Sequence, residues 1–251
     1  MGSPEPLREP VAGLDPTSGA DSAPLVGSRE RRREQLVELY KEASGCTRCP
    51  LAATRQNVVF GAGNADAELM FVGEGPGANE DRQGLPFVGR AGELLNELLE
   101  GAGLARDDVF VANAVKCRPP GNRDPQPAEL EACSGYLERQ LELIQPRVVA
   151  TLGNFATRLL TQSRDPISRV RGSPQLHTLA GRQVLVFPVF HPAAALRTPK
   201  LRESLQEDFA ALRRLLDEQL PVADEPTDDA EPAPLPDPDE RRRTDQLGLF
   251  G

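Results

Sequence analysis

The sequence predicts an α/β fold built around a mainly parallel sheet, and three patterns along the chain predict it. First, four short apolar runs are typical of buried strands; they span residues 68–72, 108–113, 147–153 and 183–190. Second, segments with helical periodicity precede, separate and follow these runs, over residues 30–43, 90–100, 127–144, 154–160 and 199–219. Third, polar and glycine-rich loops follow the strands, where parallel sheets bind ligands. We expect the loops after Val72, Ala112 and Phe190 to meet at one rim.

The two ends of the chain differ in composition from its centre. Residues 1–27 are rich in Pro, Gly, Ser and acid, and residues 221–240 read "PVADEPTDDAEPAPLPDPDE". Such segments bury too little apolar surface to offset their chain entropy, so we expect both ends to be disordered. About 190 residues remain, which is enough for one α/β domain over residues 28–220.

The net charge of −9 lies in these ends. Residues 1–27 carry −3 and residues 221–251 carry −6, so the central domain has 25 acids and 25 bases. A neutral domain can present a basic face, and DNA remains a possible partner. Because no run is apolar enough to span a membrane and the N-terminus lacks a secretory apolar region, we expect a cytoplasmic monomer.

The four cysteines are typical of a metal site. Cys46 and Cys49 form a C-x2-C pair, and Cys117 and Cys133 follow in a Pro-rich loop and a predicted helix. In a reducing compartment such cysteines are metal ligands more often than disulfides. The arrangement fits a [4Fe–4S] cluster, with structural zinc as the alternative. Four unligated cysteines are a third, less favoured interpretation.

The glycine-rich stretch "GEGPGA", with Gly73, Gly75 and Gly77, raises the question of a nucleotide site. A phosphate-binding P-loop needs a Lys and a Ser or Thr after its last glycine, and this stretch has neither. In a dinucleotide fingerprint the helix starts within the glycines, whereas we expect the helix here to begin only near Arg90. The loop instead offers close backbone, two acids and an aromatic ring to a flat polar ligand: Glu74, Glu80 and Phe87.

Two further side chains belong to the same rim. Asn113 ends an apolar strand, and its carboxamide can accept a hydrogen bond from a ring N–H and donate one to an adjacent carbonyl, the pair that uracil offers. His191 can donate to a developing oxyanion. The alternatives are an Asn that closes a turn and a histidine that packs in the core. We assign the other histidine, His177, to structure.

Taken together, these residues resemble a known family. The segments "GEGPGANEDRQGLPFVGRAG", "NAVKCRPPGNRDPQPAELEAC" and "HPAAALR", with Cys46-x2-Cys49 upstream, resemble the family 4 uracil-DNA glycosylases, iron–sulfur enzymes of bacteria and archaea. The similarity runs from about residue 35 to residue 217. It implies a three-layer α/β/α fold with a four-stranded, mainly parallel sheet and a structural [4Fe–4S] cluster held by the four cysteines. It also implies a monofunctional hydrolase that removes uracil from double- or single-stranded DNA in base excision repair.

The resemblance implies roles for the rim residues. Uracil flipped from DNA would stack on Phe87, Asn113 would read its Watson–Crick edge, and His191 would stabilise negative charge at O2. Glu74 and the backbone around Gly73 and Gly75 would position water or the sugar. Glu80 would line the pocket near the uracil C5. Leu196 and Arg197 would enter the duplex as a wedge.

Two features depart from relatives in the wider superfamily. Where one branch has a water-activating aspartate, this chain has Gly75, so the chemistry must rely on stabilising the leaving group; a base role for Glu74 stays open. Relatives that trap uracil-DNA covalently use a histidine in a loop that here reads "KCRPPGNRDPQP", without histidine. We therefore expect turnover. A non-catalytic iron–sulfur module that binds damaged or single-stranded DNA is the alternative.

The last residues of the chain carry a separate signal. After the acidic segment comes "RRRTDQLGLFG", where apolar side chains return. The pattern resembles the short peptide by which bacterial repair proteins bind the sliding clamp, and it comprises Gln246, Leu247, Leu249 and Phe250. The alternative is a chance apolar end that packs on this protein's own core.

Overall fold

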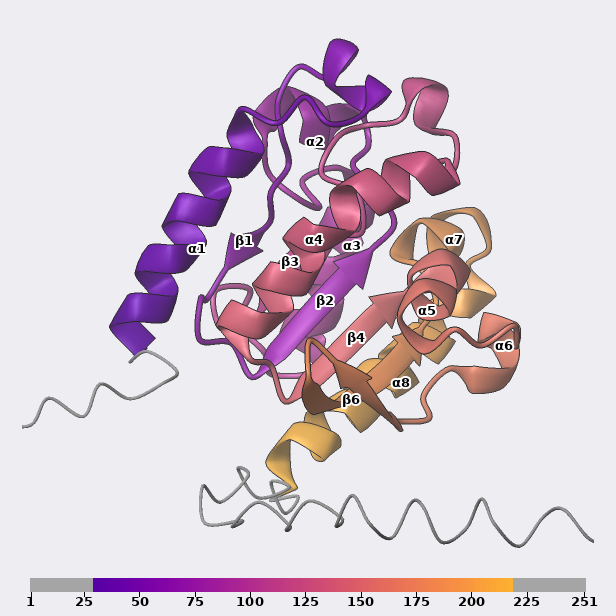
Figure 1. Ribbon diagram of the computed structural model, residues 1–251. Helices are drawn as coiled ribbons and strands as arrows, with labels where there is room; N and C mark the ends of the chain where they lie inside the picture. The colour runs from indigo at the N-terminus through magenta and orange to yellow at the C-terminus, as the bar shows by residue number, and fades with distance from the viewer. Residues whose placement is uncertain (1–28, 219–251) are drawn as a thin grey trace, which may run out of the picture.

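The computed structural model describes residues 29–218, so the expectations for residues 1–27 and for the tail from residue 221 lie outside the described part of the chain. Its centre is one six-stranded sheet in the order β1-β3-β2-β4-β6-β5 (Figure 1). The strands are β1 (Ala62–Gly63), β2 (Leu69–Gly73), β3 (Phe110–Asn113), β4 (Val148–Leu152), β5 (Gln175–Leu179) and β6 (Arg182–Val189).

The four expected strands form the parallel centre of the sheet. β3, β2, β4 and β6 are neighbours and run parallel, with Gly73 opposite Asn113 and Leu152 opposite Val189 at their carboxyl ends. The expected strand number was wrong, because two antiparallel edge strands, β1 and β5, complete the sheet. Neither carries an apolar run: β1 has two residues, and β5 alternates half-buried and exposed side chains.

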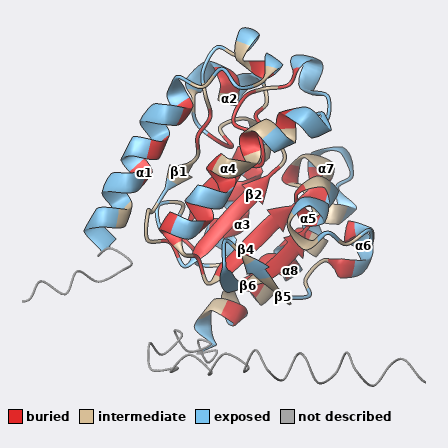
Figure 2. Cartoon of the chain, viewed as in Figure 1, coloured by how far each residue is buried: buried red, intermediate tan, exposed pale blue. Residues whose placement is uncertain are grey.

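Helices cover both faces of the sheet, as expected for three layers. α1 (Arg29–Ser44), α4 (Pro127–Ile144) and α5 (Gly153–Thr161) pack on the face that carries Met70 and Val72. α3 (Arg90–Gly101) and α8 (Lys200–Asp217) pack on the other face, against Leu69 and Phe71. Consecutive residues of one strand thus serve opposite layers, since side chains alternate across a sheet. Figure 2 shows the central strands buried and the outer face of α1 exposed.

Short helices shape the rim and correct one expectation. α2 (Ala78–Gln83) begins directly after Gly77, so a helix follows the glycine loop well before Arg90. Its six residues are too few to show apolar periodicity. The remaining short elements are η1 (Pro50–Ala53), η2 (Pro120–Asn122), α6 (Ile167–Val170) and α7 (Pro192–Arg197).

The early helix does not make the glycine loop a phosphate site. Glu80, in the first turn of α2, places its Oε2 2.7 Å from where a Cβ on Gly77 would lie. A carboxylate therefore occupies the helix start that a phosphate would need, and it would repel an anion.

None of the helices between residues 29 and 218 combines the length and apolar character that a bilayer crossing requires.

Candidate active site

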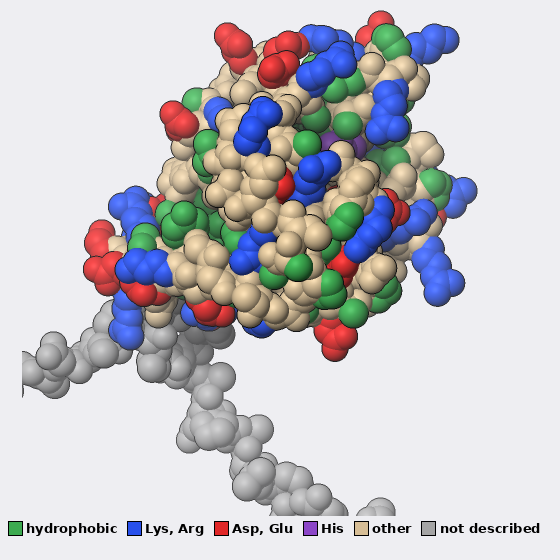
Figure 3. Space-filling view, turned by 90° about the horizontal axis from the view of Figure 1, so that it is seen from above, with side chains coloured by type: hydrophobic (Ala, Val, Ile, Leu, Met, Phe, Trp, Pro, Cys, Tyr) green, Lys and Arg blue, Asp and Glu red, His purple; other side chains and the backbone are tan. Residues whose placement is uncertain are grey.

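The three expected loops meet at the carboxyl ends of the parallel strands and enclose a pocket of about 260 Å³. Figure 3 looks down on this rim, where Lys and Arg side chains are spread around a hollow that contains a histidine. The pocket is lined by Glu74, Gly75, Pro76, Gly77, Glu80, Phe87, Ala91, Asn113, Pro119, Asn122, Arg123, His191 and Ala193.

Asn113 closes β3 with its side chain buried and its amide oxygen unused. Only 2% of the residue is exposed, and Oδ1 has no hydrogen-bond partner. The carbonyl oxygen of Asn113 accepts a hydrogen bond from Lys116 Nζ at 2.8 Å. A buried acceptor without a partner is costly, so this oxygen is poised for a donor that enters the pocket.

Gly73, opposite Asn113, leaves the space that the pocket needs. A Cβ at this position would collide with Asn113 Oδ1 and lie 2.9 Å from the ring of Phe87. Phe87 itself adopts a positive φ of 54°, which is unusual for a large side chain. Gly92 permits that conformation, because a Cβ there would overlap the carbonyl of Phe87. The glycines therefore keep an aromatic ring beside the amide.

His191 is held as a neutral hydrogen-bond donor. Its Nδ1 accepts the backbone N–H of Ala193 at 3.1 Å, so in the neutral ring the proton lies on Nε2. Burial, followed by the charge of Arg197, lowers the pKa of His191 from 6.5 to about 4. Its ring centroid lies 5.8 Å from that of Phe87 at an interplanar angle of 30°. Gly153, the first residue of α5, packs closely behind it, with φ +89° and a virtual Cβ 3.0 Å from His191 Cβ.

The two acids of the loop have different environments. Burial raises the pKa of Glu74 above 4.5, and the neighbouring carboxyl of Asp124 raises it further. Glu80 Oε1 instead accepts two backbone hydrogen bonds, from Val88 N at 3.0 Å and Gly89 N at 2.8 Å. Glu80 therefore both lines the pocket and fixes the segment that carries Phe87.

Sequence reasoning missed the contribution of the loop after β3. Pro119, Asn122 and Arg123 line the pocket. Arg123 binds Glu129 at the start of α4 through two hydrogen bonds, of 2.9 and 2.6 Å, and this pins the loop to the helix. The available signal was an Arg six residues before a Glu in the first turn of a predicted helix.

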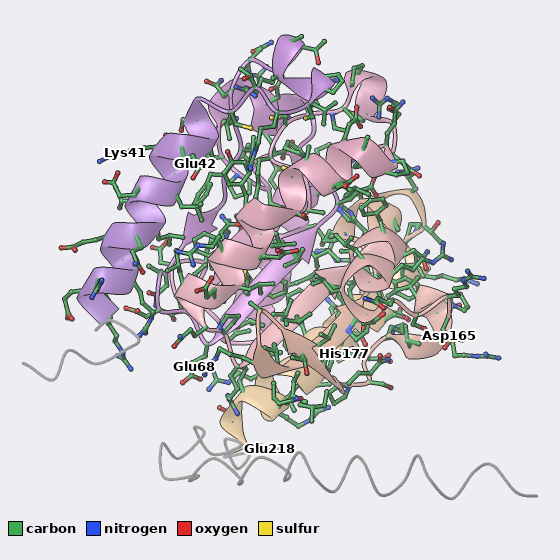
Figure 4. All side chains as sticks on the ribbon, viewed as in Figure 1. Lys41, Glu42, Glu68, Asp165, His177 and Glu218 are labelled. Carbon is green, nitrogen blue, oxygen red and sulfur yellow. The ribbon has the colours of Figure 1, made fainter. Side chains whose placement is uncertain are left out.

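Leu196 and Arg197, the expected wedge, are the last two residues of α7, the short helix that begins directly after His191. Leu196 is 36% exposed and Arg197 is also exposed. Gly75 lines the pocket without a side-chain base, as the sequence indicated. His177 lies on β5 within hydrogen-bond distance of Gln175, at 3.4 Å. Figure 4 places it low in the view, toward Glu218 and away from this rim, which agrees with a structural role.

The four cysteines gather around one end of α4. Cys117 and Cys133 are buried in the cluster of residues beneath α1 and α4, and Cys46 and Cys49 pack against that cluster. Cys133 Sγ accepts the backbone N–H of Lys116 at 3.3 Å, and Cys117 Sγ accepts from Arg55 at 3.4 Å. Between residues 29 and 218, no three His, Cys, Asp or Glu side chains are grouped closely enough to hold a single metal ion.

The pocket has the features of an enzyme that binds a nucleobase. It combines an aromatic ring, an amide with a free acceptor and a neutral imidazole donor around a small cavity. Comparison with known proteins agrees, since the model of the uracil DNA glycosylase superfamily matches residues 60–216.

Individual relatives show which type of uracil-DNA glycosylase this chain resembles. A type-4 uracil-DNA glycosylase of Sulfurisphaera tokodaii is 46% identical over 187 residues, which cover 72% of this chain and 85% of the relative. Those of Archaeoglobus fulgidus and Thermotoga maritima are 45% and 47% identical, over 75% and 70% of this chain and 97% and 93% of the relatives. The chain therefore belongs to the uracil-DNA glycosylase superfamily and, within it, to the type-4 uracil-DNA glycosylases.

Proposed function

We propose that this rim pocket takes up a uracil flipped out of DNA and hydrolyses its N-glycosidic bond, leaving an abasic site. The observation that carries the proposal is the joint presence of Asn113 and His191 in one pocket, the first with an unpaired Oδ1 and the second with its proton on Nε2. A non-catalytic DNA-binding module would need neither group there.

Asn113 supplies the recognition of uracil. Its Oδ1 accepts from the base N3–H while its amide donates to O4, and cytosine presents the opposite order of groups. Phe87 stacks on the base, and Glu80, whose carboxylate lines the pocket, faces the C5 side where thymine carries a methyl group.

His191 supplies the stabilisation of the leaving group. As the bond between C1′ and N1 breaks, its electron pair passes to the uracil ring, and the Nε2–H of His191 stabilises the negative charge at O2. Water then adds to C1′ and gives its proton to the carboxylate of Glu74, which takes the place of the aspartate absent at Gly75. Leu196 and Arg197 fill the space that the base vacates in the duplex.

The test is incubation with an oligonucleotide that contains a single uracil, followed by alkali. We expect strand breakage at uracil and none in matched oligonucleotides with thymine or cytosine at that position. Intact uracil DNA would refute the activity.

We also propose that Cys46, Cys49, Cys117 and Cys133 hold a structural [4Fe–4S] cluster. The proposal is supported by the convergence of these thiols from a loop, a second loop and a helix. A single zinc ion needs four sulfurs about 2.3 Å from one centre, and no such group lies among the described side chains. Bound there, the cluster would cross-link the loop after α1, helix α4 and the loop after β3.

Metal analysis tests the cluster. Purified protein should contain about four irons and absorb near 400 nm, as iron–sulfur proteins generally do. Cys133→Ala should lower the melting temperature, because cluster binding is coupled to folding. The fraction of the variant that remains folded should keep most of its rate of uracil release. One equivalent of zinc in a colourless, fully active protein would contradict the proposal.

A further inference from the structure

Lys116 is a buried cation that the proposed chemistry does not use. Only 1% of the residue is exposed, yet the ion pairs formed within residues 29–218 do not include it. Its Nζ donates instead to two neutral oxygens: the carbonyl of Asn113 at 2.8 Å and Oε1 of Gln140 at 2.5 Å. Burying an ammonium without a carboxylate is costly, and an apolar side chain of similar length would fill the same space.

The contacts of Lys116 join three parts of the fold. Gln140, fully buried on α4, donates from Nε2 to the carbonyl of Phe60 at 2.9 Å. The backbone N–H of Lys116 donates to the Sγ of Cys133, which lies about two turns before Gln140 on α4. The carbonyl of Lys116 accepts from Val59 N at 2.8 Å. One residue thus connects the end of β3, helix α4 and the segment before β1.

These contacts have a direct consequence for the pocket. Asn113 is the last residue of β3, and its side chain reaches the pocket without any hydrogen bond to Oδ1 that would orient it. On the side toward α4, the bond from Lys116 holds the Asn113 peptide unit. An active-site amide must be placed to within a fraction of an ångström, so the support of its backbone matters for the rate.

We propose that Lys116 is a positioning residue: it clamps the Asn113 peptide to Gln140 and to the helix that carries Cys133, and thereby couples the cysteine site to uracil recognition. This inference rests on the proposed function of the pocket. A disturbance of the cysteine site would change the position of the Asn113 amide through two bonds of Lys116: the backbone N–H bond to Cys133 Sγ and the Nζ bond to the Asn113 carbonyl.

The test compares Lys116→Met with wild type in single-turnover and steady-state assays well below the melting temperature of either protein. We expect kcat to fall roughly 10- to 100-fold while KM changes little, because the DNA contacts that set KM stay in place. Binding of free uracil should weaken by a similar factor, and the Asn113 side-chain amide signal should broaden in the 15N NMR spectrum. Iron content should stay at the wild-type value.

Two further variants separate positioning from general destabilisation. Arg147→Met removes hydrogen bonds to the carbonyls of Leu215 and Glu218 at the far end of the sheet and serves as the control. It should lower the melting temperature without lowering kcat. Gln140→Leu keeps the bond from Lys116 to the Asn113 carbonyl but removes the bonds of Gln140 with Lys116 Nζ and with the carbonyl of Phe60. It should shift kcat and uracil binding in the same direction as Lys116→Met, by less.

A wild-type kcat and wild-type uracil affinity in Lys116→Met would overturn the inference. A second result would also overturn it. This result is that Lys116→Met and Gln140→Leu lose no more kcat than Arg147→Met does when the variants have lost the same melting temperature. If the wild-type chain released no uracil, the proposed function would fail, whereas free-uracil binding and the amide signal would still test Lys116.

Discussion

At the scale of single residues, the site depends on which groups stay neutral and which are charged. His191 carries its proton on Nε2 because Nδ1 accepts from Ala193, and burial brings the pKa of its ring to about 4. The imidazole is therefore a neutral donor throughout the range in which most proteins work. For Glu74 the pKa shift has the opposite direction, because burial favours the neutral form of a carboxyl group by raising its pKa above 4.5.

A pH profile distinguishes these two groups. If ionised Glu74 takes the proton of water, the single-turnover rate rises with pH through a pKa above 4.5. Glu74→Gln should remove this acid limb and lower the rate at neutral pH. Asp124→Asn should move the limb to lower pH without abolishing it, since burial, the larger cause of the shift, remains. An unchanged limb in Glu74→Gln would rule out Glu74 as the base.

The sequence predicted that Asn113 and His191 lie together at the rim, and both line the pocket there, but it did not predict their surroundings. Asn113 and His191 were predictable because the first ends an apolar strand and the second follows one, and parallel strands bring such ends together. Asp124 and Arg123 were not, because they sit in a loop without periodicity whose path depends on the bonds from Arg123 to Glu129. Gly153 was missed for a similar reason: it packs behind His191 through a contact between the start of α5 and the start of α7, which are far apart in the sequence.

At the scale of elements, the glycines of the rim act by leaving out side chains. Gly73→Ala should lower kcat/KM by about 10²-fold, because the new methyl group collides with Asn113 Oδ1 and presses on Phe87. The measurement is single-turnover release of uracil, with folding checked by melting temperature.

Gly135→Ala is the matched control for this substitution. Gly135 lies inside α4, and a Cβ there meets nothing within 4 Å. It should keep full activity and gain roughly 0.5–1 kcal/mol of stability, the usual advantage of Ala over Gly in a helix. Equal activity of Gly73→Ala and Gly135→Ala would mean that the wall between β2 and β3 does not shape the pocket.

The elements that the sequence predicted well are the long ones. α4 was predicted over residues 127–144 and spans Pro127–Ile144, since it combines Pro at its first position with a buried apolar face. The sequence did not predict α2, β1 and β5, because they have six, two and five residues and no full apolar period. The edge strands depend on pairing with a neighbour, which is a property of the sheet and not of the segment.

At the scale of the whole molecule, the sequence separates a neutral catalytic domain from acidic ends, and residues 241–251 lie outside the described part of the chain. We propose that Gln246, Leu247, Leu249 and Phe250 dock on a sliding clamp, with Gln246 as the polar anchor and Leu249 and Phe250 in an apolar pocket. A tether of this kind raises the effective concentration of the domain near DNA without new contacts.

Truncation tests the tail. Full-length protein and a version that ends at Asp245 are titrated calorimetrically with the clamp of the same organism. We expect binding by the first and none by the second, while both cleave short uracil oligonucleotides at the same rate. Equal binding by both versions, or binding by neither, would refute the clamp peptide.

The central claim is that a neutral His191, in the same pocket as the free amide oxygen of Asn113, stabilises the departing uracil. The most direct measurement is single-turnover release of uracil from a duplex oligonucleotide by wild type and His191→Ala, with DNA affinity measured in parallel. We predict a rate about 10² to 10³-fold lower in the variant, the usual cost of one lost oxyanion donor, and nearly unchanged affinity for the DNA. A near-normal rate in His191→Ala would contradict the account.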